Sequence, residues 1–99
     1  MKMRRVEAKV VNMLHMTGKK TSTSEISDTL ELNYPYVNLA LNRMTRIGSL
    51  SFIRRGRHKY FYLVGDYTGL LVDARVELTG LPHEDVVAQL KKEVKNAKS

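Results

Sequence analysis

The stretch from Ser22 to Leu63 constrains the fold more than any other part of this sequence. Its pattern predicts a short helix, a tight turn, a second helix and then a hairpin of two strands. No carboxylate lies between Glu31 and Asp66, and this interval holds six cations: Arg43, Arg46, Arg54, Arg55, Arg57 and Lys59. Ordinary protein surfaces intersperse charges of both signs, whereas a surface that binds a polyanion is positive throughout. The interval is therefore a candidate nucleic-acid interface.

The net charge of the 99-residue chain is +7, and nearly all of the excess lies in its middle third. Residues 1–31 carry six cations and four anions, a balance of +2. Residues 32–65 carry six cations and no anion, whereas residues 66–99 carry five cations and six anions. The positive charge thus has a definite place in the chain, and it coincides with the predicted helix and hairpin.

Length and composition exclude several classes of protein. The length suits one domain, and a hydrophobic share of 42% with 27% charged residues is typical of a soluble globular protein. There is no cysteine, no secretory signal and no apolar stretch that could span a membrane, so we expect a cytoplasmic, nucleoid-associated protein.

Catalysis and cofactor binding are not expected. The sequence has no evident nucleophile–base set and no glycine-rich phosphate loop, so it predicts no enzyme and no cofactor. A metal site would need His15, His58 and His83, which fall in three different predicted elements.

The first predicted helix runs from Arg4 to Met16. Apolar residues recur at three- and four-residue steps, and the two methionines Met13 and Met16 are expected in the core. Glu7 and Lys9 fall off this stripe, and Gly18 ends the helix.

A second, short helix begins at a capping box. Ser22 and Glu25 have the spacing at which a hydroxyl and a carboxylate each satisfy a free backbone amide. Ile26 and Leu30 then face inward, and Leu32-Asn33 turns the chain.

The third predicted helix, Pro35–Ile47, carries the candidate base contacts. Asn33 can cap it, and Pro35 lies in the first turn, where a missing amide has no cost. Its apolar stripe consists of Val37, Ala40, Leu41, Met44 and Ile47. The other face presents Tyr36, Asn38, Leu39, Asn42, Arg43 and Arg46. Asparagine can pair with adenine and arginine with guanine, and an aliphatic side chain can contact the thymine methyl group, so this face suits a major groove.

Each of these residues also has a plain alternative. Exposed asparagine and arginine are common on any helix, and Leu39 is either a base contact or a core residue. Tyr34 and Tyr36 either pack at the edge of the core or donate their hydroxyl groups to phosphates.

The predicted hairpin has a basic tip. Leu50, Phe52 and Ile53 begin one strand, and Lys59 to Val64 form the other. The basic segment Arg54–Lys59 at the tip includes Arg55, Arg57 and His58. Charge on an edge hairpin also prevents aggregation, which is the alternative explanation. That explanation accounts for one or two cations, but not for a cluster beside a basic helix.

Thr21 to Val64 resembles a winged helix-turn-helix domain of bacterial, archaeal or phage DNA-binding regulators. The resemblance rests on Ser22-Thr23-Ser24-Glu25-Ile26, Leu30-Glu31-Leu32, the apolar positions of the third helix, Gly48-Ser49-Leu50 and the segment Arg55 to Leu63. It implies an α+β fold with three helices and a two- or three-stranded wing. It also implies that the third helix enters the major groove and that the wing contacts the backbone or minor groove. Many such proteins have serine, threonine or arginine where this chain has Tyr34, Tyr36 and Leu39.

The remainder of the chain predicts a strand and helix extension. Residues from Leu70 to Thr79 alternate with period two, which favours a strand, although Leu70, Leu71, Ala74 and Leu78 also fit a helix. A last amphipathic helix starts near His83, with Val86, Val87, Leu90, Val94 and Ala97 as its apolar face. We therefore expect a DNA-binding domain over residues 1–64 and a C-terminal extension over 65–99. Its last helix packs either on the first helix or on its copy in a second subunit, and we favour a homodimer through this end.

Three functions remain open from the residues. A sequence-specific regulator of double-stranded DNA is favoured by the asparagines of the third helix. An architectural or RNA-directed binder without strong sequence preference needs only the charge. A winged-helix module for protein–protein interaction needs neither these asparagines nor the positive charge.

Overall fold

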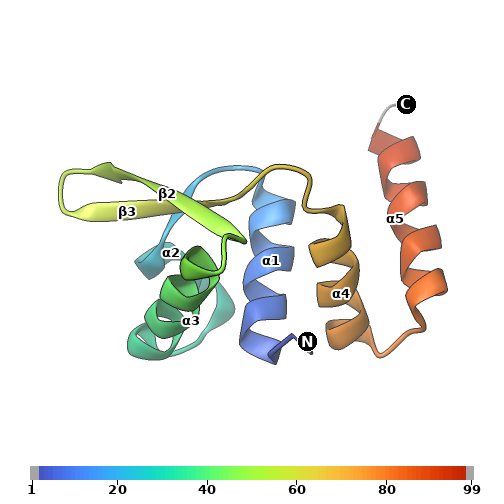
Figure 1. Ribbon diagram of the computed structural model, residues 1–99, viewed down its shortest axis with the longest axis horizontal. Coiled ribbons are helices and arrows are strands. Elements are labelled where there is room, and N and C mark those ends of the chain that lie inside the picture. The colour runs from blue at the N-terminus through green and yellow to red at the C-terminus, as the bar shows by residue number, and fades with distance from the viewer. Residues whose placement is uncertain (1–2, 98–99) are drawn as a thin grey trace.

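A computed structural model describes residues 3–97 of the chain, and the surroundings of its side chains through residue 93. Five helices and three strands form a single array measuring 40 × 30 × 24 Å (Figure 1). In chain order the elements are α1 Arg5–Thr17, β1 Thr21–Ser22, α2 Thr23–Leu30, α3 Tyr34–Arg46, β2 Leu50–Arg55, β3 His58–Leu63, α4 Thr68–Thr79 and α5 His83–Ala97. This is the winged helix-turn-helix fold that the sequence predicts, with three strands in its sheet.

Helix α1 lies at the centre of the array. Helices α2 and α3 and the sheet pack on one side of it, α4 packs on the other side, and α5 covers α4 (Figure 1). Val10 and Val11 of α1 are fully buried, because the helix has neighbours on both sides. One hydrophobic core extends from α3 through α1 to α5 and includes Leu41, Leu71 and Val86.

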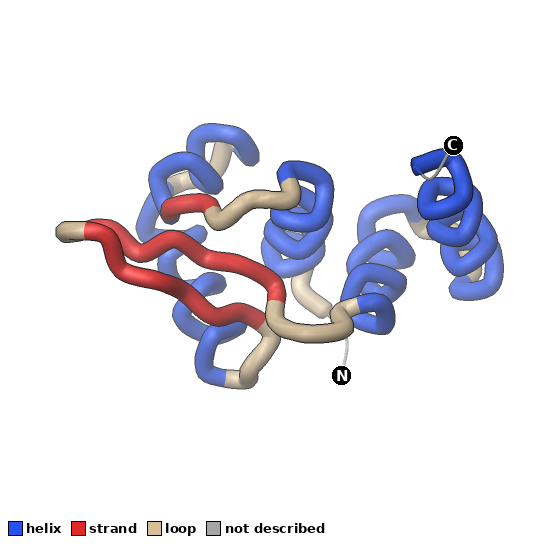
Figure 2. Tube along the Cα trace, turned by 90° about the horizontal axis from the view of Figure 1, so that it is seen from above, coloured by secondary structure: helices blue, strands red, loops and turns tan. Residues whose placement is uncertain are grey.

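The sheet is antiparallel with the strand order β1–β3–β2. In the wing, Leu50 lies opposite Leu63 and Arg55 lies opposite His58. The two-residue strand β1, which is not predicted from the sequence, pairs Thr21 with Phe61. Thr21 is buried, and this pairing ties the start of α2 to the wing. Figure 2 shows that the turn of the hairpin projects beyond the helices.

The helix-turn-helix unit forms as its local sequence predicts. The Ser22 side chain accepts a 3.2 Å hydrogen bond from the Glu25 backbone amide, so the predicted N-cap is confirmed. The reciprocal half of the predicted capping box is not formed, because the Glu25 carboxylate accepts a 3.2 Å hydrogen bond from the Ser22 hydroxyl and not from the Ser22 backbone amide. Helix α2 ends at Glu31, whose φ of 55° lies in the left-handed region. Asn33 occupies the N-cap position of α3, but its side chain forms no capping hydrogen bond.

Of the two structures left open for Leu70–Thr79, the favoured strand is wrong and the helix is correct, because this segment belongs to helix α4. Helix α4 is covered by α1 on one side and by α5 on the other (Figure 1), so apolar residues are needed around much of its circumference. A helix of this kind loses the 3.6-residue periodicity that distinguishes a helix from a strand in a sequence. Gly80 at φ 74° then ends it.

Three expectations about burial are also wrong. Ile47, predicted in the core, is 58% exposed because it follows the last turn of α3. Met16 is exposed as well, since α1 extends beyond the core at its C-terminal end. Glu7, expected at the surface, is buried. The expectations for Val94 and Ala97 lie outside the described side chains.

Candidate nucleic-acid interface

Helix α3 buries one face and presents the other to solvent. Val37, Leu41 and Met44 are buried against α1, α2 and the sheet, so the opposite face must point outward. Tyr34, Tyr36 and Leu39 are 51%, 53% and 69% exposed. Leu39 is therefore not a core residue, and about half of each tyrosine is exposed.

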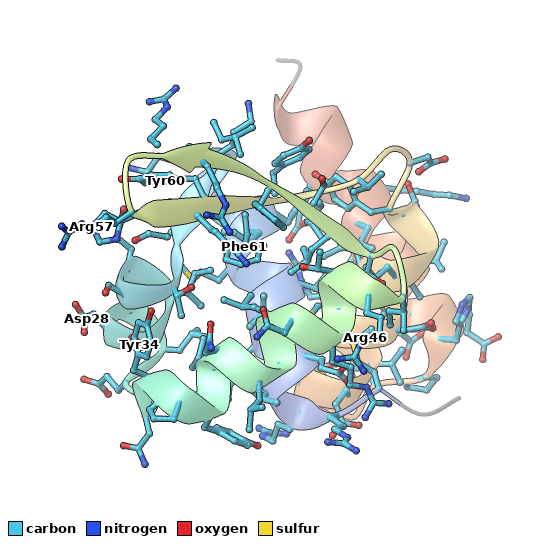
Figure 3. All side chains as sticks on the ribbon, turned by 60° about the vertical axis from the view of Figure 1, so that its left-hand side comes forward. Asp28, Tyr34, Arg46, Arg57, Tyr60 and Phe61 are labelled. Carbon is cyan, nitrogen blue, oxygen red and sulfur yellow. The ribbon has the colours of Figure 1, made fainter. Side chains whose placement is uncertain are left out.

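A groove separates α3 from the wing, and we call it the wing groove. It has a volume of about 210 Å³, and its lining side chains come from the start of α2, from α3 and from the wing. Its lining residues are Ser22, Thr23 and Ser24 at the start of α2, Tyr34, Asn38 and Asn42 on α3, and Arg57, His58 and Lys59 on the wing. None of these residues is acidic. In Figure 3, Arg57 at the turn of the wing and Tyr34 at the start of α3 lie at the same end of the molecule.

A second groove, the α1 groove, lies along the opposite flank of α3. It has a volume of about 370 Å³. Arg4, Val6 and Glu7 of α1 form one wall, and Tyr36, Leu39, Ala40, Asn42, Arg43 and Arg46 of α3 form the other. Arg46 lies at the end of α3 away from Tyr34 (Figure 3). Asn42 lines both grooves and so occupies the ridge between them.

The wing distributes its cations over both faces of the hairpin. Residues directly opposite each other in a sheet share a face, so Arg54 and Lys59 lie on the same face as Phe52 and Phe61, which point toward the core. The Lys59 ammonium group lies 4.6 Å from the centre of the Phe52 ring. A cation–π contact of this length restrains the lysine at the edge of the wing groove.

The predicted site residues thus fall into three sets. Six of them meet in the wing groove: Tyr34, Asn38, Asn42, Arg57, His58 and Lys59. Tyr36, Leu39, Arg43 and Arg46 line the α1 groove. Arg54 and Arg55 are exposed on β2 but line neither groove.

The sequence did not indicate that the start of α2 belongs to this surface. Ser22, Thr23 and Ser24 line the wing groove, and their backbone amides lie at the positive end of a helix dipole. The capping box located this helix end along the chain. Only the pairing of β1 with β3 places it beside the wing.

Arg43 is not free, because it pairs with a residue of α1. Its Nε atom lies 3.6 Å from Oε2 of Glu7, and the Glu7 side chain is only 8% exposed. The other carboxylate oxygen of Glu7, Oε1, accepts a 3.1 Å hydrogen bond from the Arg4 backbone amide. Glu7 therefore fixes the start of α1 and contacts the candidate base-reading helix at the same time.

Other kinds of site have little support in the described part of the chain. Residues 3–97 contain no group of three or more histidine, cysteine or acidic side chains placed to hold a metal ion. None of the described helices is long and apolar enough to cross a membrane. A cavity of about 540 Å³ lies between α1 and α5 beside His15 and Tyr67, but it contains none of the predicted site residues.

Comparison with solved structures identifies the class of the fold. The transcriptional regulator BldR from Sulfolobus solfataricus superimposes with a TM-score of 0.65 over 97% of this chain and 76% of its own, at 12% identity. A MarR family transcription regulator gives a TM-score of 0.64 at 12% identity and covers 94% of this chain and 68% of that one.

The PcaV transcriptional regulator from Streptomyces coelicolor, solved with its natural ligand, gives a TM-score of 0.61 at 18% identity. The match covers 99% of this chain and 78% of PcaV. No protein-family model matches the sequence, and no curated protein matches it. At these identities the likeness establishes the winged helix-turn-helix fold.

Proposed function

We propose that this chain is a transcriptional regulator that binds double-stranded DNA in a sequence-specific manner. In this proposal α3 enters the major groove and the wing segment Arg54–Lys59 contacts the backbone or minor groove. The single observation that carries it is the wing groove, which joins the asparagines of α3 to Arg57 and Lys59 without an intervening carboxylate. The solved structures of similar fold include several described as transcriptional regulators.

The dimensions of α3 suit this role. Its 13 residues correspond to a rod of about 20 Å, and a major groove about 12 Å wide admits one helix. Asn38, Asn42 and Arg46 recur every four residues, so they form one row along the helix. Asparagine can recognise adenine and arginine can recognise guanine, and a binder that uses charge alone has no need of the asparagines.

The phosphate contacts in this proposal come from both sides of the wing groove. Arg57 and Lys59 supply charge, and the amides at the start of α2 supply hydrogen-bond donors to the same backbone. Tyr34 lines the same groove, and in this proposal its hydroxyl donates to a phosphate oxygen.

We further propose that residues 1–64 contact DNA and that the protein is located at the nucleoid. The extension over residues 65–99 joins two copies of the chain into a homodimer through α5. Helix α5 is the outermost element of the array (Figure 1). Its first turn carries Glu84 and Asp85, whereas Lys91 and Lys92 follow two turns later, and all four are exposed. Two copies packed antiparallel would place each acidic turn against the basic end of the other helix.

The dimer is tested by sedimentation of the full chain. Reversing Glu84 and Asp85 to lysine should lower the dimer fraction, and reversing Lys91 and Lys92 to glutamate in the same chain should restore it. Restoration is the informative result, because simple unfolding cannot produce it. An unchanged dimer mass in the first variant would place the interface elsewhere.

The DNA-binding proposal is tested by selecting bound duplexes from a random pool and then titrating salt. A specific regulator should enrich one sequence and bind it roughly 10³-fold or more tightly than random duplex. A steep salt slope without such a ratio would favour the architectural or RNA-directed alternative. Intact function after neutralisation of Arg54, Arg55 and Arg57 would favour a protein–protein interaction module.

A further inference from the structure

The strongest unexplained feature outside the base-reading face is the buried carboxylate of Glu7. This residue is 6% exposed, and it lies in the wall of the α1 groove among Arg4, Arg43 and Arg46. A carboxylate is costly to bury and repels a polyanion, so its place behind a DNA-reading helix needs an explanation.

The contacts of Glu7 indicate what it does. Oε1 accepts the Arg4 backbone amide at 3.1 Å, which fixes the carboxylate relative to α1. Oε2 then faces Nε of Arg43 at 3.6 Å, so the anion lies on the Nε side of the guanidinium. An arginine carries five N–H donors, one on Nε and four on Nη1 and Nη2. One of those four lies parallel to Nε–H, and Nη1 and Nη2 together form an end-on fork. Among the described residues, none accepts a hydrogen bond from those four.

We propose that Glu7 is a positioning residue that makes Arg43 a base-reading arginine and prevents it from acting as a phosphate-binding one. This inference rests on the proposed DNA-binding function. The carboxylate holds the Nε side of the guanidinium, which leaves Nη1 and Nη2 to form the paired contact with a guanine edge. It also cancels the charge of Arg43, so that a phosphate gains little from this residue.

The consequence concerns specificity more than affinity. Without Glu7, Arg43 becomes a mobile, uncompensated cation that can pair with any nearby phosphate. Binding to random duplex should then become tighter and more sensitive to salt, while preference for the selected sequence declines. A purely structural role for Glu7 predicts parallel weakening of both duplexes instead.

A neighbouring carboxylate offers a matched control. Asp73 of α4 lines a small cavity of about 120 Å³ together with Glu7 and Arg43, and it is exposed. No ion pair between Asp73 and Arg43 is present in the described structure. Asp73→Asn removes the same charge from the same region without removing a contact to Arg43.

The experiment measures binding of Glu7→Gln, Asp73→Asn and wild-type chain to the pool-selected duplex and to a random duplex across a salt series. For Glu7→Gln we expect the ratio of specific to random affinity to fall roughly tenfold. We also expect the salt slope on random duplex to steepen by about one unit. Asp73→Asn should leave the ratio close to the wild-type value. Equal effects of the two substitutions would overturn the proposal. They would show that the loss of one negative charge in this region changes the binding, and not the loss of the contact between Glu7 and Arg43.

The route through Arg43 is tested by a double substitution. In an Arg43→Ala background, Glu7→Gln should not lower the ratio of specific to random affinity any further. If Glu7 acted independently of Arg43, the losses from the two substitutions would add. If Glu7→Gln does not fold, Glu7→Asp carries the test, because it keeps the charge but withdraws the carboxylate from Nε. A folded Glu7→Asp chain with the wild-type ratio contradicts the proposal. Wild-type chain that binds no duplex at all would instead overturn the proposed function itself.

Discussion

Nε of Arg75 on α4 donates a 2.6 Å hydrogen bond to Oδ1 of Asn12 on α1, although 63 positions separate the two residues. The same guanidinium donates from Nη1 to Oε1 of Glu93 on α5 at 3.0 Å. Its side chain is only 12% exposed. Arg75 therefore links helices α1, α4 and α5.

Arg75→Ala should lower the free energy of unfolding by about 2–3 kcal/mol, because it removes charged hydrogen bonds from a largely buried site and leaves Asn12 without its partner. Urea denaturation followed by circular dichroism measures this change. Glu93→Ala is the control, since its carboxylate is 47% exposed and an exposed pair contributes about 0–1 kcal/mol. Equal losses in the two variants would contradict the central role of Arg75.

Asn42→Ala should cost about 1–3 kcal/mol on the selected duplex and relax the preference at one base position. The physical reason is that Asn42 lies on the ridge of α3 between the two grooves, where a base edge would approach. Repeating the pool selection with the variant identifies the relaxed position. A uniform loss over all sequences would mean that Asn42 contacts the backbone.

Arg57→Ala should weaken binding to all duplexes alike and reduce the salt slope by about one unit, because a phosphate contact carries no sequence information. Arg57→Lys is the matched control, since it keeps the charge at the turn of the wing and should preserve the slope. Fluorescence anisotropy across a salt series gives both slopes. A change of base preference in Arg57→Ala would assign this residue to a groove and not to the backbone.

Glu31→Gly should stabilise the chain by about 0.5–1 kcal/mol. Glu31 adopts φ 55° in the turn between α2 and α3, a conformation that costs a residue with a side chain roughly 1 kcal/mol or more relative to glycine. Glu31→Ala removes the same charge from the end of α2 but keeps the strain. The difference between the two variants in urea denaturation isolates the backbone effect, and a stability of Glu31→Ala equal to that of Glu31→Gly would exclude it.

Thr68→Ala should raise the pKa of Asp66. The Thr68 hydroxyl donates a 2.6 Å hydrogen bond to Oδ1 of Asp66 and the Thr68 amide donates another at 3.1 Å, and these two bonds hold the pKa of this exposed carboxyl below its usual 3.8. A lowered folded-state pKa contributes stability that is present above the usual value and lost as pH falls through the folded value. Carboxyl titration by NMR should show a partial rise, because the amide bond remains. An unchanged pKa would mean that the hydroxyl bond is absent in solution.

The helices and the wing could be predicted because their signals are local. The Ser22 and Glu25 capping box, Pro35 near the start of α3 and the aromatic strand at Tyr60–Leu63 each depend on neighbours within a few positions. Helix α4 was not predicted with the same success. Its apolar residues pack against both α1 and α5, and a helix with partners on two sides loses the amphipathic pattern.

The sequence by itself determined the order of the elements from α2 to β3, the concentration of charge between Glu31 and Asp66 and the outer face of α3. Only the tertiary structure decided which of those residues meet. The pairing of Thr21 with Phe61 brings the start of α2 to the wing, and the packing of α1 on α3 brings Glu7 to Arg43. Spacing within a helix or strand is set by the backbone repeat and is visible in the sequence, whereas contacts between distant elements depend on how their side chains fill a shared core.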